Sequence, residues 1–136
     1  MMKFSRIMVT LLAAMGIYVG SANAQKEVAE QINAVSPQEF QSRLAADTTA
    51  YLLDARTATE YAAGHLKGAH QLNWLDSAAF ENGAKLLDKS KTIYVYCRSG
   101  HRSGLAARYL AVRGYNIVDM KGGYLAWTAA GLETEK

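Results

Sequence analysis

Short apolar runs alternate with amphipathic stretches along the chain beyond residue 24. The clearest apolar run covers residues 92–97, where β-branched and aromatic side chains follow one another without a polar interruption. Such a run is typical of a strand that is covered on both faces of a sheet. Shorter runs predict further strands at residues 51–54, 69–72 and 116–120.

The stretches between these runs carry the signals of helices. Ser36 is expected to cap a helix that begins at Pro37, with Glu39 as its capping-box partner. Helices are predicted at residues 37–45, 57–63 and 76–87, after residue 103 as far as Gly114, and at residues 124–130. Because strands and helices alternate, the pattern predicts an α/β domain with a mostly parallel central sheet flanked by helices.

The beginning of the chain has the pattern of a signal peptide. Two basic residues precede an apolar run of 14 residues, and an Ala-x-Ala cleavage sequence ends at Ala24. The run is shorter than the about 20 residues that span a bilayer, which favours a cleaved signal peptide over an uncleaved anchor. We therefore expect residues 1–24 to direct export to the periplasm, and residues 25–136 to form one domain without a membrane partner.

Charge and composition narrow the function further. The formal net charge of +3 includes Lys3 and Arg6 of the expected signal peptide, so the rest of the chain is nearly neutral and is not expected to bind nucleic acid. Cys97 is the only cysteine, which excludes an internal disulfide and an iron–sulfur cluster. The three histidines and Cys97 lack a compact ligand spacing, so no metal is predicted.

Cys97 is the candidate nucleophile, because it stands at the end of the clearest predicted strand. Ligands of parallel sheets bind outside the carboxyl ends of the strands. The loop over residues 97–103 contains small residues that let successive N–H groups face one centre, and Arg98 and Arg102 add positive charge. These features favour a thiolate at Cys97. The alternative is that this lone cysteine is a small buried hydrophobic residue.

Four motifs follow one another along the chain. They are Asp54-Ala55-Arg56; Glu60-Tyr61 with Gly64-His65-Leu66-Lys67-Gly68-Ala69; the loop over residues 97–103; and Gly114-Tyr115 followed by Gly122-Gly123-Tyr124, Trp127 and Gly131. In this order they resemble the motifs of the single-domain rhodaneses, the thiosulfate sulfurtransferase-like proteins. The resemblance implies a rhodanese-like domain with a central sheet of about five strands. Among rhodaneses, the chain is similar in size and layout to small periplasmic ones, which implies a monomer or a weakly associating enzyme.

The resemblance also implies an activity, which is ping-pong sulfur transfer. The Cys97 thiolate would take the outer sulfur of thiosulfate or a similar donor and become a persulfide. An acceptor would then remove that sulfur, cyanide in an assay and a thiol in the cell. No metal or organic cofactor is implied. The substrate would be bound by the loop residues Arg98, Ser99, Gly100, His101, Arg102 and Ser103.

Several polar residues of the motifs are expected to support the site rather than react. Asp54 and Arg56 should hold neighbouring loops through ion pairs, with Glu60 as a partner. His65 is expected in a structural turn, because attack by a thiolate needs no strong base. After Gly68-Ala69 the family commonly has Asn and then Pro, which this chain lacks, and we expect Trp74 to cover part of the active-site mouth.

Two other functions remain as alternatives. A non-enzymatic persulfide carrier or binding module would keep the same cysteine. A cysteine-dependent phosphatase needs a Cys-x5-Arg loop, whereas here four residues separate Cys97 from Arg102, and Ser103 stands where the arginine should be. The shorter loop suits a sulfur better than a tetrahedral phosphate, which makes the phosphatase the less favoured alternative.

Overall fold

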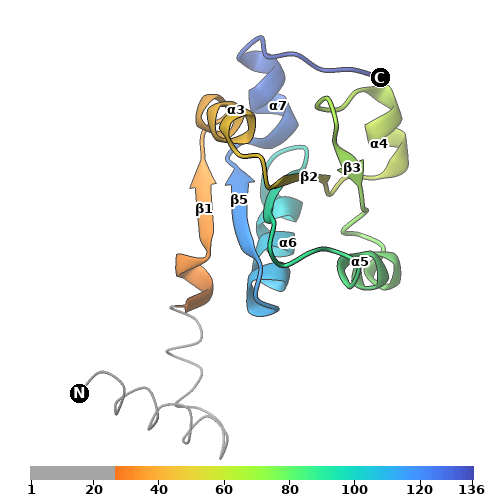
Figure 1. The fold of residues 1–136 in the computed structure, drawn as a ribbon. Coiled ribbons are helices and arrows are strands. Elements are labelled where there is room, and N and C mark those ends of the chain that lie inside the picture. Colours follow the sequence, from red (N-terminus) through yellow and green to blue (C-terminus); the bar gives the residue numbers. More distant parts are fainter. Residues whose placement is uncertain (1–26) are drawn as a thin grey trace, which may run out of the picture. The chain divides into compact units, whose positions relative to one another are not determined.

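A computed structural model of the protein describes residues 27–136, and the expected signal peptide lies outside the described residues. The fold is that of residues 31–136, which form one unit. Five strands pair in parallel in the order β1-β5-β4-β2-β3 (Figure 1). They are β1 (Ile32–Val35), β2 (Ala50–Asp54), β3 (His70–Gln71), β4 (Thr92–Tyr96) and β5 (Asn116–Met120). The predicted α/β architecture with a parallel sheet is confirmed.

The middle of the sheet is β4, which pairs with β2 on one side and β5 on the other. Its last four residues are buried, as the uninterrupted apolar run predicts. The sequence pattern does not predict β1. It is a four-residue edge strand whose two central residues are exposed, so its pattern is too short and too polar to indicate a strand.

Within residues 31–136, five helices flank the sheet. They are α3 (Pro37–Ala46), α4 (Ala58–Ala63), α5 (Ser77–Ala84), α6 (His101–Val112) and α7 (Gly123–Ala129). Among residues 27–136, no helix is both long enough and apolar enough to cross a bilayer. α6 begins at His101, so the last three residues of the predicted loop form the first turn of this helix.

The end of α5 and the cap of α3 differ from the prediction. α5 ends at Ala84 rather than residue 87, because the chain tightens into turns in which Leu86 and Leu87 donate hydrogen bonds to Gly83 and Ala84. Ser36 caps α3 as expected by accepting a hydrogen bond from the N–H of Glu39. The Glu39 carboxylate, however, accepts a 2.8 Å hydrogen bond from Arg43 and does not complete a capping box.

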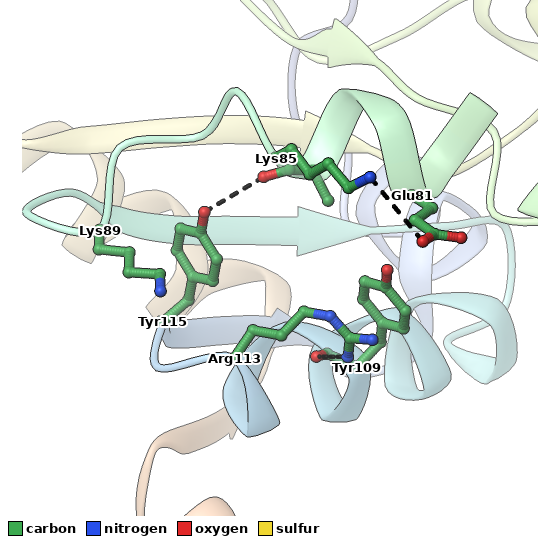
Figure 2. Close-up of a pocket in the computed structure, with 7 residues that line it drawn as sticks. Glu81, Lys85, Lys89, Tyr109, Arg113 and Tyr115 are labelled. Carbon is green, nitrogen blue, oxygen red and sulfur yellow. Dashed lines mark hydrogen bonds and ion pairs between the residues drawn. The ribbon is translucent and has the colours of Figure 1, made fainter. Parts of the chain in front are cut away.

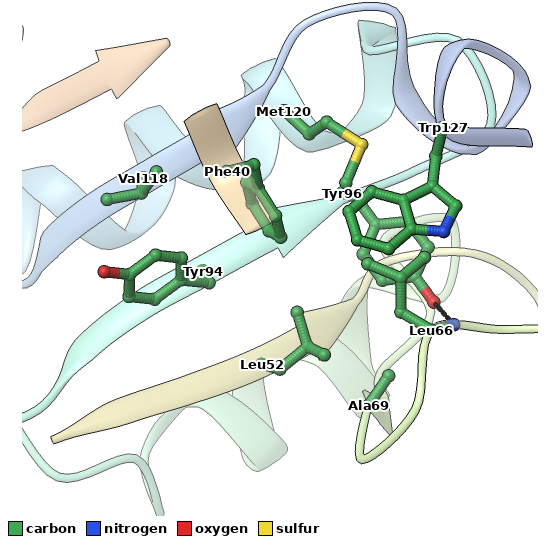
Figure 3. Packing of buried hydrophobic residues seen from close by; sticks show 9 residues of the cluster. All are labelled: Phe40, Leu52, Leu66, Ala69, Tyr94, Tyr96, Val118, Met120 and Trp127. Atoms are coloured by element: carbon green, nitrogen blue, oxygen red, sulfur yellow. Dashed lines mark hydrogen bonds between the residues drawn. The ribbon is translucent and has the colours of Figure 1, made fainter. Parts of the chain in front are cut away.

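Aromatic side chains pack together with aliphatic ones in the core between the sheet and helices α3 and α7 (Figure 3). The ring of Phe40 in α3 meets the rings of Tyr94 and Trp127 edge-on, at centroid distances of 5.4 and 6.4 Å. Side chains of a strand point alternately to the two faces. Because Tyr94 and Tyr96 face this core, Val95 and Cys97 face the opposite side, which α6 covers.

Candidate active site

Cys97 follows β4 directly and is fully buried at the start of a tight loop. Its Sγ accepts a hydrogen bond of 3.1 Å from the backbone N–H of Gly100. Gly100 has a φ of 102°, in the left-handed region that favours glycine, and this conformation turns the loop into the start of α6. The loop therefore brings a backbone donor back onto the sulfur.

The first turn of α6 adds further donors near Cys97. The N–H groups of a helix's first turn have no partner within the helix. In α6 they belong to His101, Arg102 and Ser103, and the first intrahelical bond is donated by Gly104 to the carbonyl of Gly100. Together with the Gly100 N–H, these groups form the sulfur cradle, by which we mean the backbone N–H groups of residues 100–103. Such a cradle favours a negative charge on the sulfur.

The N-terminus of α7 holds the other side of the loop. Tyr124 donates its N–H to the carbonyl of Cys97 at 2.7 Å, and Leu125 donates to that of Arg98 at 3.0 Å. This approach needs a glycine at position 123, because a Cβ there would lie 2.5 Å from the Cys97 carbonyl oxygen. The sequence shows the Gly-Gly pair as a motif, but it does not predict this contact with the loop.

Arg102 forms an ion pair with Glu60 and is not an unpaired cation beside the sulfur. Its two terminal nitrogens donate hydrogen bonds of 2.7 and 2.8 Å to the Glu60 carboxylate. Glu60 in turn completes a capping box with Thr57 at the start of α4. Hydrogen bonding to Arg102 lowers the pKa of Glu60 to about 2, and the same contact raises the pKa of Arg102. The ion pair links α4 to the first turn of α6.

Asp54 and Arg56 form a separate, buried ion pair at the end of β2. The Arg56 Nη2 lies 2.7 Å from Asp54 and also donates to the carbonyl of Gly64. The Tyr96 hydroxyl donates to Asp54 at 2.6 Å and accepts from the N–H of Leu66. The network fastens the segment around residues 64–66 to β2 and β4. Glu60, expected as a partner of these residues, is engaged with Arg102 instead, because the α4 capping box turns its carboxylate toward α6.

His65 lies in this segment, around residues 64–66, and each of its two ring nitrogens has a polar neighbour. Its ring stacks on Tyr61 at a centroid distance of 3.7 Å, and its Nδ1 lies 2.9 Å from the Tyr61 carbonyl oxygen. Its Nε2 is 3.5 Å from a carboxylate oxygen of Glu135. This packing matches a structural turn better than a catalytic base.

The remaining loop residues divide by exposure. Arg98, Ser99 and His101 are exposed, whereas Ser103 is buried and its hydroxyl donates to the Gly100 carbonyl at 3.3 Å. Arg98 is therefore the cation of the loop that is open to solvent. Within the described range, no group of His, Cys, Asp and Glu side chains has the arrangement of a metal site.

Trp74 does not take the position expected over the loop. Its ring packs edge-on against Phe80 and Tyr109, at centroid distances of 5.0 and 5.8 Å. Tyr109 lies about two turns along α6 from His101, so the ring is held between α5 and the flank of α6. The backbone at this position is held by a hydrogen bond of 3.0 Å from the Trp74 N–H to the carbonyl of Ala55.

A hollow of about 270 Å³ lies at the opposite end of β4 from Cys97. Tyr109, Arg113 and Tyr115 line it together with α5, and the Lys85–Glu81 ion pair borders it (Figure 2). The Arg113 guanidinium stacks over the Tyr109 ring at 3.5 Å. The hollow is separate from the sulfur cradle.

Known proteins share this fold. A family model described as the rhodanese-like domain matches residues 36–130. A sulfurtransferase of Allochromatium vinosum is 32% identical over 102 residues, which cover 74% of this chain and 92% of that protein. The solution structure of the rhodanese-like domain of Alr3790 from Anabaena has a TM-score of 0.65 and 29% identity, over 75% of this chain and 77% of that chain.

A rhodanese-related protein from Thermoplasma volcanium has a TM-score of 0.68. At 23% identity, over 76% of this chain and 97% of that one, it shows the shared fold alone.

We predict that Gly123→Ala displaces the loop at Cys97, because its methyl group would collide with backbone atoms of Cys97 and Arg98. The matched control is Gly68→Ala, since Gly68 also has a positive φ, of 82°, but a methyl group placed there would have no atom within 4 Å. Both variants should lose about 1 kcal/mol from backbone strain. Only Gly123→Ala should also change the rate of Cys97 alkylation, and equal alkylation rates in the two variants would contradict the close contact.

We predict that Glu60→Gln lowers the free energy of unfolding by about 1–2 kcal/mol near neutral pH, after allowance for solvent screening of the partly exposed pair. Because the pKa of Glu60 lies at about 2, below its usual value of 4.5, its stabilisation is complete above the usual value and is lost as pH falls through about 2. Urea denaturation at several pH values measures this. Glu39→Gln, in an exposed pair, is the control. A loss that is the same at neutral and strongly acidic pH would contradict the assignment.

Proposed function

The chain belongs to the rhodanese-like domain family, and we propose that it is an exported sulfurtransferase that works through a persulfide on Cys97. The donor would be thiosulfate or a similar compound with a sulfane sulfur. The acceptor would be thiophilic, with cyanide serving in vitro and a thiol in the cell. A sulfurtransferase role is in keeping with the relative from Allochromatium vinosum.

The observation that carries the proposal is the position of the Cys97 sulfur in the cradle. The Gly100 N–H already donates to Sγ at 3.1 Å, and the first-turn N–H groups of α6 are available to a further anionic atom. Preorganised backbone donors of this kind stabilise charge without rearranging during the reaction. The cradle therefore suits both the thiolate and the negatively charged outer sulfur of a persulfide.

In the first half-reaction, the Cys97 thiolate attacks the sulfane sulfur of thiosulfate. A bond forms between Sγ and that sulfur, the sulfur–sulfur bond of the donor breaks, and sulfite leaves with the electron pair. In the second half-reaction, cyanide or a thiolate attacks the outer sulfur, and the electron pair of the Sγ–S bond returns to Cys97. Thiocyanate or a new persulfide leaves, and no oxidant or cofactor is consumed.

The two loop arginines would have different roles. Arg102 is paired with Glu60, so its main contribution is to hold the first turn of α6 in place. Arg98 is exposed and adjacent to Cys97, which suits it to attract the anionic donor. Ser99 and His101 are exposed on the same rim, where the donor would arrive.

Export to the periplasm is proposed from the first 24 residues alone. Their basic start, apolar run and Ala-x-Ala sequence support cleavage after Ala24. The mature enzyme would act as a monomer on small sulfur compounds, without a resident metal or organic cofactor.

Mass spectrometry of the intact protein purified after export tests the proposal. We expect a chain that begins at Gln25, gains one sulfur atom with thiosulfate and loses it with cyanide. Cys97→Ser should show the same cleavage and gain no sulfur. An uncleaved chain would contradict export. A cleaved chain that gains no sulfur from thiosulfate, mercaptopyruvate or polysulfide would contradict the transferase, and a single turnover of thiocyanate would indicate a carrier.

We predict that Arg98→Gln raises the KM for thiosulfate by about three- to tenfold and changes kcat little, because a charge on the rim steers the donor without contacting the transition state. The effect should shrink as salt is added. Arg108→Gln, at an exposed position further along α6, is the matched control and should leave KM unchanged. Steady-state formation of thiocyanate measures both, and an equal KM for all three proteins would rule out this role.

A further inference from the structure

Asp119 is a buried carboxyl group that the sulfur-transfer mechanism does not use. It is the fourth residue of β5, and only 8% of its surface is exposed. Its Oδ1 has no hydrogen-bond partner in the part of the chain that the structure describes. A buried polar atom without a partner is costly, and such atoms are rare in folded proteins. An unpartnered carboxyl oxygen on the central sheet therefore indicates that Asp119 has a functional role.

The sheet turns Asp119 toward the same side as Cys97. Its neighbours Val118 and Met120 belong to the core under α3 and α7, so Asp119 points to the opposite face, beneath α6. Asp119 pairs across the sheet with Val95, which lies two residues before Cys97. The carboxyl group and the sulfur thus lie on one face of two adjacent strands.

Ser103 connects Asp119 with the sulfur cradle. Its hydroxyl donates to the carbonyl oxygen of Gly100 at 3.3 Å. Ser103 also lies near enough to the Asp119 carboxyl group for hydrogen bonding between them to lower the pKa of Asp119. Gly100 is the residue whose N–H donates to the Cys97 Sγ. Because a hydroxyl has one proton, Ser103 donates fully to only one of these two acceptors.

The protonation state of Asp119 would decide which of these two acceptors Ser103 serves. An ionised carboxylate attracts the Ser103 proton to itself. A protonated carboxyl group donates to the Ser103 oxygen, which leaves the Ser103 proton for the carbonyl of Gly100. Each state of Asp119 therefore corresponds to a different hydrogen bond at the peptide that holds the sulfur.

The surroundings of Asp119 shift its pKa, so that the carboxyl group changes its protonation state at mildly acidic pH. Burial raises the pKa of Asp119 to about 6, although hydrogen bonds from Ser103 and from the N–H of Met120 lower it. Next to it, the charged or titratable groups are Cys97 after β4, His101 and Arg102 in the first turn of α6, and Lys121 after β5, whereas β1 places Ala34 beside it. Further along α6, Arg108 is exposed and Tyr109 packs against Phe80, and the tyrosines of β4 face the opposite core. Arg102 is paired with Glu60, and His101 and Lys121 are exposed. No described cation neutralises Asp119.

We propose that Asp119 is a positioning residue that exchanges a proton with solvent as the charge in the sulfur cradle changes. It takes up a proton when the cradle holds a thiolate or a persulfide anion, and it releases the proton when that negative charge leaves. Two negative charges in one buried region disfavour each other, and this coupling is reciprocal. An ionised Asp119 therefore favours the thiol form of Cys97 and helps a charged sulfur to leave. The persulfide part of this inference rests on the proposed function, whereas the coupling to the thiolate does not.

The test is the rate of Cys97 alkylation by iodoacetamide as a function of pH, in the wild-type protein and in Asp119→Asn. We expect Asp119→Asn to react about three- to tenfold faster near neutral pH, because the opposing charge is gone, and equally fast at high pH, where the thiolate is fully formed. Asp88→Asn is the matched control. Its exposed carboxylate lies before β4, at the far end from Cys97, and its profile should match that of the wild type. Superimposable profiles for Asp119→Asn and the wild type would overturn the proposal.

A second measurement covers the case in which Asp119→Asn does not fold. In the wild-type protein, the Asp119 carboxyl carbon is titrated by NMR after alkylation of Cys97 with iodoacetate, which leaves a negative charge, or with iodoacetamide, which leaves none. The titration midpoint should be higher in the charged adduct, and equal midpoints would refute the coupling. Neither measurement needs a sulfur donor, so a failure to load sulfur from thiosulfate is a separate result.

Discussion

The site depends on the contact between the loop after β4 and the first turn of α7. Two N–H groups of α7 bind the carbonyl groups of Cys97 and Arg98, at 2.7 and 3.0 Å. With these carbonyl groups held on one side, the chain curls so that the Gly100 N–H meets the sulfur on the other. The contact exists because Gly123 has no side chain to separate the two backbones. A loop anchored through its backbone gives a nucleophile with fixed donors around it, and this is what persulfide chemistry requires.

Most of the charged side chains around the loop form ion pairs, so their charges balance one another. Arg56 is balanced by Asp54 within the buried network, and Arg102 is balanced by Glu60 between α4 and α6. These pairs brace the elements around the cradle, and the stabilisation of a charged sulfur is left to backbone dipoles. Asp119 is different, because it is buried and no described cation balances it. A negative charge there opposes the one that the cradle favours, which makes the site responsive to pH.

The sequence pattern predicts strands and helices whose residues are uniformly buried. It does not predict contacts between residues that are far apart in the sequence. β4 and its terminal Cys97 are predictable because five apolar or β-branched residues lead directly to a loop with small and basic residues. The Glu60–Arg102 pair joins residues 42 positions apart, and no local pattern links them. Asp119 falls inside a predicted apolar strand. The only signal in the sequence is a carboxylate within a run that must be buried. Its position on the same face of the sheet as Cys97 becomes visible only in the fold.

On the proposed function, backbone N–H groups of residues 100–103 receive the transferred sulfur on Cys97. The most direct measurement is the amide NMR spectrum of the protein before thiosulfate, after it, and after cyanide. We expect the largest shifts on Gly100, His101, Arg102 and Ser103, and we expect cyanide to reverse them. Sulfur loading on Cys97 that leaves these four amides unchanged would contradict the cradle.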